Sequence, residues 1–192
     1  TLALSPVQTW GLENDDGGFV STGDTNQWEW GPVESGPYSS HDGSNAWGTV
    51  LDGDYLNDSV DMLTLPPLTL SDLERPVLSF SHWIDIDEEG DIGTIETETA
   101  EGWASIDPIY GYPDGSGFRG LSGEWETVYF DLTGIDDLSQ LRLRFSADEI
   151  VARSGWFVDD FQVWDGDPTP PLITLLTESS DTEDLTLGPE II

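Results

Sequence analysis

The sequence contains no cysteine and no lysine, and its five basic residues are all arginine. Without cysteine, a disulfide framework, a thiolate zinc site and a cysteine nucleophile are excluded. Without lysine, Schiff-base chemistry is excluded as well. The chain has only two histidines, His41 and His82, and lacks H-E-x-x-H and G-x-S-x-G segments. We therefore expect a protein that is not an enzyme.

The charge is almost entirely of one sign, because 39 acidic residues face five basic ones and give a net charge of −34. A compact chain with this charge repels itself, so we expect surroundings rich in salt or divalent cations. Nucleic acid is excluded as a partner because its binding needs a basic face. No apolar run approaches the ~18 residues that span a bilayer, so we expect no membrane insertion.

Helical periodicity is nearly absent, while 21 glycines and 12 prolines interrupt the chain at short intervals. Several segments are rich in valine, threonine and aromatic residues, and many of them alternate with period two. The predicted strands are 7–13, 27–30, 46–51, 59–65, 77–86, 92–99, 124–131, 141–146 and 155–164. This pattern predicts an all-β fold, a two-sheet antiparallel jelly-roll β-sandwich.

One domain boundary is visible near residue 167. Residues 1–167 hold all the aromatic residues, and a proline-rich spacer opens the segment 168–192. The segment 172–192 has no aromatic and no basic residue, so we expect an extended tail that builds no core of its own. Its short apolar stretches could pair with a sheet edge of the same chain or of a neighbouring copy.

Five segments, in this order and spacing, resemble the MAM-like jelly-roll modules of secreted bacterial proteins. They are WEWG at 28–31, SHDGSNAWGT at 40–49, FSHW at 80–83, LRF at 143–145 and GWFVDD at 155–160. Such modules include the C-terminal modules of immune inhibitor A type metalloproteases and many surface adhesins. The resemblance covers residues 7–165 and implies a non-catalytic extracellular β-sandwich that commonly holds calcium. The chain departs from that pattern in its acidity and its tail.

Two adjacent carboxylates, Asp159 and Asp160, lie inside the otherwise aromatic and β-branched strand 155–164. An ionised side chain beside a sheet core is unfavourable unless a cation or several hydrogen-bond donors neutralise it. Neighbouring strand residues point to opposite faces, so we expect only one of the two to face a bound ion.

The family resemblance implies a calcium site built from the first and last strands. Glu13 matches the acidic end of the first strand, and Asp159 or Asp160 matches the paired aspartates. Asp24 and Asp42 are further candidate ligands, because calcium takes about six to eight oxygen atoms in irregular geometry. The alternative is that these carboxylates cap turns and accept backbone N–H groups.

A second acidic segment, 85–96, has the spacing of an EF-hand loop, with glycine at its sixth position. Its flanks are predicted strands instead of helices, so it is either a solvated hairpin tip or a second calcium loop. The candidate ligands are Asp85, Asp87, Glu89, Asp91 and Glu96.

Aromatic residues flank a loop rich in glycine, tyrosine and aspartate at 108–123. Trp103, Tyr110 and Tyr112 are candidate glycan-binding residues, since sugar rings stack on aromatic side chains. The alternative is that these residues fill the core and anchor the loop.

The main functional expectation is a non-catalytic, extracellular or cell-surface module, stabilised by calcium, with a structural or adhesive role. Self-association through its terminal segments into filaments, with the tail as an intersubunit strand, is one form of that role. Its other expected partners are a cell-surface protein or a glycan. The alternative is a glycan-binding accessory domain of a larger secreted hydrolase.

Overall fold

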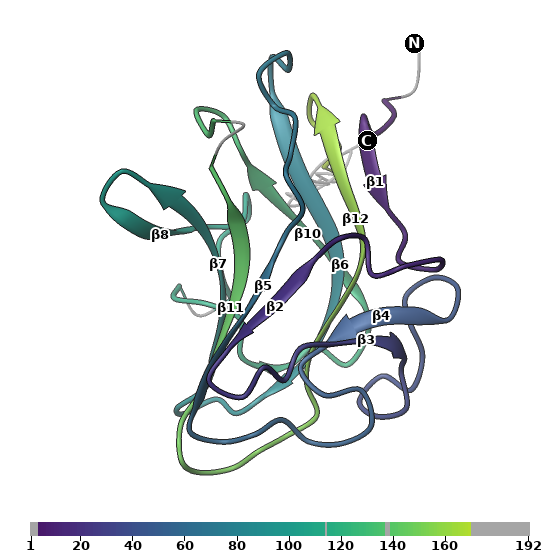
Figure 1. The fold of residues 1–192 in the computed structure, drawn as a ribbon, viewed down its shortest axis with the longest axis vertical. Helices are drawn as coiled ribbons and strands as arrows, with labels where there is room; N and C mark the ends of the chain where they lie inside the picture. Colours follow the sequence, from purple (N-terminus) through teal and green to yellow (C-terminus); the bar gives the residue numbers. More distant parts are fainter. Residues whose placement is uncertain (1–3, 114, 137–138, 170–192) are drawn as a thin grey trace, which may run out of the picture.

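The computed structural model describes residues 4–113, 115–136 and 139–169, which form strands joined by loops and contain no helix (Figure 1). These residues therefore include no helix long and apolar enough to cross a membrane. The strands are β1 (Gln8–Trp10), β2 (Val20–Gly23), β3 (Glu29–Pro32), β4 (Asn45–Gly48), β5 (Ser59–Thr64), β6 (Pro76–Ile86), β7 (Ile92–Thr99), β8 (Gly102–Ile106), β9 (Gly120–Leu121), β10 (Glu126–Asp131), β11 (Leu141–Ala147) and β12 (Gly155–Asp165).

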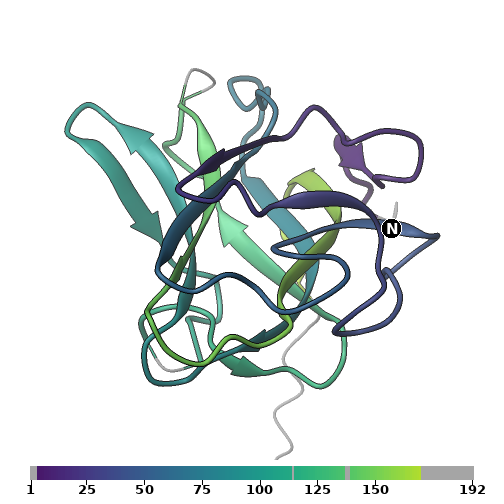
Figure 2. The same ribbon diagram turned by 60° about the horizontal axis from the view of Figure 1, so that its bottom comes forward.

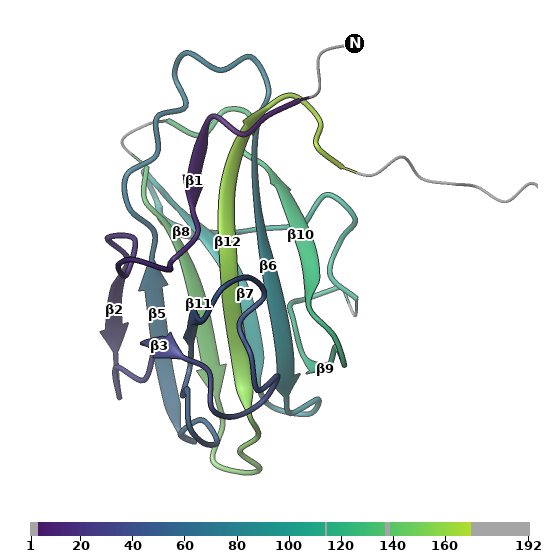
Figure 3. The ribbon, with the colours of Figure 1, turned by 90° about the vertical axis from the view of Figure 1, so that its right-hand side faces the viewer.

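The strands form two antiparallel sheets that pack face to face. The seven-stranded sheet has the order β10-β6-β12-β4-β3, with β1 paired to β12 and β9 paired to β6. The five-stranded sheet has the order β2-β5-β11-β7-β8. Figure 3 shows β1, β12, β6 and β10 side by side in the larger sheet. The predicted all-β jelly-roll sandwich is confirmed.

Period-two alternation decides which side chains enter the core between the sheets. In β11, Leu141, Leu143 and Phe145 are buried, while Arg142 and Arg144 alternate with them and are partly exposed. On the facing sheet, aromatic rings from three strands meet: the Phe80 ring stacks on those of Phe130 and Phe161, with centroids 5.7 and 4.9 Å apart. These aromatic contacts join β6, β10 and β12 into one wall of the core.

Strand β6 is buried on both of its faces, which its sequence alone does not explain. Its inner side chains enter the core, and Trp83 on the outer face packs with Phe157, Val33 and Leu51 in a small second core. The loop between β3 and β4, residues 33–44, closes this second core over the outer face of the sheet.

The sequence located the long strands and missed the edge strands β2, β8 and β9. These strands are short and largely exposed, so they lack a pattern of buried apolar residues. The β7–β8 hairpin projects from the side of the sandwich in Figures 1 and 2. The predicted strand 7–13 is wrong in its second half, because Leu12 has a positive φ of 58° and the chain turns there. From residue 170 on, the expected tail lies outside the described residues.

Candidate functional site

The loop between β3 and β4 reaches the outer face of the seven-stranded sheet closely enough to cover it. At Gly36 the backbone has φ 61°, and an added Cβ would lie 2.7 Å from the Phe157 ring. A side chain there would therefore collide with β12 and would also adopt an unfavourable backbone conformation. Glycine at this position lets the loop lie flat on the sheet and brings residues 41–45 over β12.

Asp159 is fully buried beneath this loop. Its Oδ2 accepts the backbone N–H groups of His41 and Asp42 at 3.1 and 3.2 Å. The register of β12 against β6 shifts between Asp159 and Gln162, and Asp160 has φ 51°, so a β-bulge lies here. Because of the bulge, the Asp160 carboxylate also reaches His41, with Oδ2 2.6 Å from Nδ1. Both aspartates therefore contact the turn that begins at His41, although neighbouring strand residues normally point to opposite faces.

Burial raises the pKa of the Asp159 carboxyl group to about 7, and the neighbouring Asp160 carboxylate acts in the same direction. The N–H groups of Asp42, Asp160 and His41 oppose that rise by stabilising the ionised form. The carboxyl group therefore changes its charge near neutral pH, unlike an ordinary aspartate.

Glu13 holds the other end of the same turn. Its Oε2 accepts the N–H of Ser44 at 2.8 Å, and its Oε1 accepts the N–H of Asn45 at 3.0 Å. At Gly43, which has φ 62°, an added Cβ would lie 2.1 Å from the carboxylate carbon of Glu13. The turn from His41 to Asn45 is thus held between the carboxylates of Glu13 and Asp159, and we call it the clamped turn.

The structure brings Glu13, Asp42, Asp159 and Asp160 together at the clamped turn and places Asp24 elsewhere. Asp24 Oδ2 accepts the N–H of Val60 at 3.0 Å, at the start of β5. The grouping of Asp24 with the other candidate ligands is therefore wrong. The sequence analysis placed Asp24 with the other candidate ligands around one ion. In the structure, Asp24 follows the edge strand β2, which pairs with β5 in the other sheet.

The carboxylate beside Asp24 is Asp61, a fully buried residue that the sequence analysis missed. Burial acts to raise its pKa, but hydrogen bonds from Thr25 and Gln27 outweigh it and hold the pKa below the usual value. In β5 the buried positions are Ser59, Asp61 and Leu63, so Asp61 faces inward with Leu63. The sequence did not reveal this, because the apolar neighbours Val60 and Met62 alternate with Asp61 and would be expected to take the inward face.

The second acidic segment forms the turn between strands β6 and β7. Asp87 and Asp91 are buried there. The Tyr55 hydroxyl hydrogen-bonds to the Asp91 carboxylate and accepts the N–H of Asp87 at 3.1 Å. Asp91 Oδ1 also accepts the N–H of Asp148 at 2.7 Å, and Arg153 Nη2 lies 3.5 Å from Asp87 Oδ1. Hydrogen-bond donors of the protein therefore contact both buried carboxylates, and among the described residues a cation lies near Asp87 alone.

The remaining candidates of this segment do not converge on that turn. Asp85 lies within β6 opposite Leu121 of β9, and Glu89 is exposed. Glu96 lies in β7, where Arg142 Nε donates to its Oε2 at 2.7 Å. The EF-hand spacing is therefore not matched by an EF-hand arrangement of ligands, because the segment is a strand hairpin in which the twelfth position extends away from the turn.

The donor atoms at the clamped turn are compatible with calcium if other oxygen ligands contribute. In the described part of the chain, no group of three or more Asp, Glu, His or Cys side chains is arranged to hold a metal ion. A carboxylate offers about four acceptor positions, of which two are used at Glu13 and three at Asp159. The exposed Asp42, backbone carbonyls and water molecules would have to complete the shell.

Two of the five arginines lie next to each other on the outer face of the five-stranded sheet. Arg142 Nε and Nη2 are both 2.7 Å from Glu96 Oε2, and the Arg142 guanidinium carbon lies 3.8 Å from the Trp103 ring centroid. Arg144 Nε lies 3.9 Å from Glu96 Oε1. We call Glu96, Trp103, Arg142 and Arg144 the arginine–tryptophan face.

The sequence alone predicts only part of the arginine–tryptophan face. The alternation of 141–145 places both arginines on one side of a strand, but it does not reveal which strands lie beside it. Pairing of β11 with β7 and of β7 with β8 brings Glu96 and Trp103 to the arginines. The sequence analysis named Trp103 and Glu96 for separate reasons and missed Arg142 and Arg144.

The three candidate glycan-binding aromatic residues do not form one platform. Trp103 is 37% exposed on the arginine–tryptophan face. Tyr112 is buried, and its hydroxyl donates to Ile106 O at 2.9 Å and accepts the N–H of Ile95 at 3.3 Å, so it anchors the loop to the sandwich. Tyr110 is largely exposed and lines a cleft beside β10.

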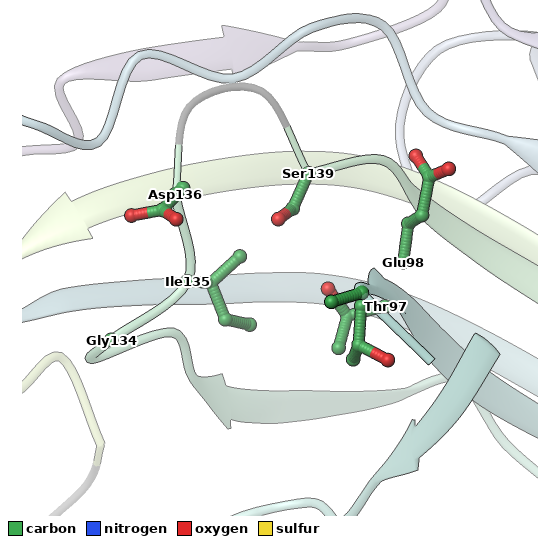
Figure 4. A pocket seen from close by; sticks show the side chains of 8 residues that line it. Thr97, Glu98, Gly134, Ile135, Asp136 and Ser139 are labelled. Carbon is green, nitrogen blue, oxygen red and sulfur yellow. The ribbon is translucent and has the colours of Figure 1, made fainter. Parts of the chain in front are cut away.

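A hollow of about 410 Å³ lies beside the C-terminal end of β7 (Figure 4). Thr97 and Glu98 approach it from β7, and Ile135, Asp136 and Ser139 approach it from the connection between β10 and β11. Its two carboxylates come from different elements and share no hydrogen-bonding partner among the described residues, so the hollow has the character of a solvated acidic surface.

Comparison with known proteins relates the chain to modules of larger proteins. No protein-family model matches it. It is 27% identical over 166 residues to Bacillopeptidase F of Bacillus subtilis (strain 168), and the match covers 83% of this chain. The chain spans only 11% of that relative's length.

Two solved structures are similar to this chain at low sequence identity. The K1 cleaved adhesin domain of Lys-gingipain from Porphyromonas gingivalis W83 is 12% identical, with a TM-score of 0.51, and the match covers 83% of this chain and 98% of that one. A xylan-binding domain from Paenibacillus barcinonensis is 13% identical, with a TM-score of 0.49 and coverage of 86% and 97%. The adhesin domain thus has the same β-sandwich fold.

We expect Asp159→Asn to change how the stability depends on pH when divalent cations are absent. The pKa of about 7 in the folded protein lies above the ordinary 3.8, so the protonated carboxyl group favours folding at low pH. This contribution is lost as the pH rises through 7. Between pH 5 and 8, the unfolding free energy of the variant should therefore gain about 3 kcal/mol relative to the unsubstituted protein.

Urea denaturation at both pH values measures this difference. Asp42→Asn is the matched control, because it removes the same charge from an exposed position in the same turn. A difference that stays constant with pH for Asp159→Asn would contradict the raised pKa.

Proposed function

We propose that this chain is a non-catalytic, extracellular, MAM-like binding module that serves as an accessory domain of a larger hydrolase and binds glycans. The observation that carries this proposal is the arginine–tryptophan face, where Arg142 lies between the Trp103 ring and the Glu96 carboxylate. The similarity to an 11% portion of Bacillopeptidase F supports an accessory role within a larger protein.

The chemistry of this face suits a sugar. An indole ring has two flat faces, and because Arg142 covers one face of Trp103, the C–H side of a pyranose would stack on the other. Guanidinium and carboxylate groups beside the ring can bond the sugar hydroxyls. Arg142 is already fixed by two contacts of 2.7 Å, so little side-chain entropy remains to be lost when a ligand binds.

The distribution of charge gives a second reason to propose that this face binds a ligand. The chain carries only five arginines against 39 acidic residues, and solubility does not require two of them on one exposed sheet face. Glu96 and Glu98, which pairs with Trp103 across β7 and β8, balance these two charges on the same side of the sheet. Such a face, with charges of both signs and little net charge, suits neutral glycans.

A non-catalytic role agrees with the positions of the two histidines. His82 is buried in the core and His41 bonds to Asp160, so neither is placed beside a serine or threonine nucleophile in the hydrogen bonds of the described residues.

Glycan binding is tested by calorimetry with soluble oligosaccharides of xylose, glucose and galacturonic acid. Trp103→Ala and Arg142→Lys should each weaken binding about tenfold, because the first removes the stacking surface and the second removes the planar fork. Tyr38→Ala is the control, since Tyr38 is an exposed aromatic residue on the loop between β3 and β4. Binding that survives both variants, or no saturable binding to any glycan, would refute the proposal.

We also propose that calcium binds at the clamped turn and stabilises the module. Glu13 and Asp159 support this proposal because their carboxylates hold one turn of a strongly acidic chain, and the exposed Asp42 lies in that turn. A bound cation would favour the ionised form of the buried Asp159 and would hold the turn on β12.

Calcium at 100 times its dissociation constant should add about 2.7 kcal/mol to the unfolding free energy, and chelation should lower the melting temperature by roughly 5–10 °C. Glu13→Gln should remove most of this response, whereas Asp24→Asn should keep it because Asp24 lies at β5. A melting temperature that does not respond to the chelator would exclude the calcium site.

Self-association is a second candidate role, favoured by the open edge at β8. This strand ends the five-stranded sheet, its first four residues are exposed, and it carries neither lysine nor proline. Edges of this kind accept a further strand. We propose that the segment 168–192 of a neighbouring copy supplies this additional strand.

Light scattering should show assembly of the full chain and no assembly after deletion of 168–192. Assembly of the shortened chain would contradict this role.

A further inference from the structure

A cleft of about 370 Å³ lies between β6, β10 and the segment 108–122, and it shares no residue with the arginine–tryptophan face. Ile84, Phe118 and Val128 form part of its wall, and Tyr110 lies among its lining residues. Its volume is in the range of about 300–1,000 Å³ that small-molecule sites occupy. It is therefore large enough for a ring-shaped ligand.

His82 lines this cleft and has no hydrogen-bonding partner among the described residues. Its side chain is only 2% exposed, and its Nδ1 is buried without a partner. The imidazole packs edge-on against the Phe118 ring at a centroid distance of 4.5 Å. A neutral imidazole offers one N–H donor and one acceptor, and leaving such a group unpaired in the interior costs about 1–3 kcal/mol.

Burial lowers the pKa of His82 to about 3, so the imidazole is neutral at physiological pH. Arg119 and Glu126, the lining side chains of this cleft that carry a charge at neutral pH, have opposite charges. Neither the imidazole nor this pair gives the cleft a net charge, so it suits an uncharged ligand.

The residues that line the cleft indicate which uncharged ligand it can bind. Ile84, Phe118 and Val128 give the cleft an apolar side, while Tyr110, Ser122, Thr127 and Tyr129 add hydroxyl groups to its lining. Next to His82, whose imidazole packs against the Phe118 ring, a phenol matches its surroundings because its one hydroxyl suits the imidazole and its apolar ring suits the aromatic ring.

We propose that this cleft binds a phenolic ring, whose hydroxyl hydrogen-bonds with the His82 imidazole while the ring packs against Phe118 and Val128. The ring comes either from a tyrosine side chain of a peptide or from a free small phenol. The site is separate from the glycan-binding face, so either can fail without the other.

The experiment uses the full chain labelled with ¹⁵N. Because the protein has only two histidines, its imidazole nitrogens give two sets of signals, and His41 serves as an internal control. Titration with 4-ethylphenol should shift the His82 ring signals in a saturable manner and leave those of His41 unchanged. Ethylbenzene, which lacks the hydroxyl, should bind about tenfold more weakly. N-acetyltyrosinamide in place of 4-ethylphenol distinguishes the peptide source from the free phenol.

Two variants separate ligand binding from a purely structural histidine. His82→Phe should remove the preference for 4-ethylphenol over ethylbenzene while keeping the fold. Tyr110→Ala, at an exposed position, should weaken binding of both compounds. Equal binding of the two compounds to the unsubstituted protein, no saturable shift at His82, or a response at His82 to methyl glucoside instead of the phenols would each overturn the proposal.

Discussion

Buried carboxylates that accept backbone N–H groups hold the loops of this protein onto its two sheets. With five arginines against 39 acidic residues, salt bridges cannot neutralise the acidic side chains that folding buries, whereas backbone N–H groups are available in every loop. Three connections are fixed in this way, by Asp61 at 25–26, by Asp159 at 41–42 and by Asp91 at 148. The partly exposed Asp165 holds residues 74–75 by the same kind of contact. The jelly-roll core supplies the apolar area, and these carboxylates determine where the loops lie on it.

The clamped turn shows how this constraint creates a site. The β-bulge at Asp160 turns two adjacent carboxylates toward one loop, and Glu13 holds the other end of that loop. The same contacts that fix the turn leave acceptor positions on Glu13 and Asp159, which is the basis for the proposed calcium ion. Structural and metal-binding roles are thus compatible in one set of carboxylates.

Two of the five arginines lie apart from the carboxylates that hold the loops. Arg142 and Arg144 stand together on an open sheet face beside Trp103, away from the carboxylates that hold loops. The cleft at His82 lies at another edge of the sandwich, and its lining combines apolar residues such as Ile84 and Val128 with an uncharged imidazole. The module therefore presents two separate surfaces with different chemistry.

The sequence by itself determined the fold class, because period-two alternation is a local property, which β11 shows in both its sequence and its burial. It also pointed to Glu13 and Asp159 together, through the order of motifs along the chain. Only the tertiary structure decided that Asp24 lies at β5, that Tyr112 anchors a loop, and that Arg142 lies against Trp103. These outcomes depend on which strands pair across long sequence separations and on one bulge, and neither is contained in the local alternation of residues.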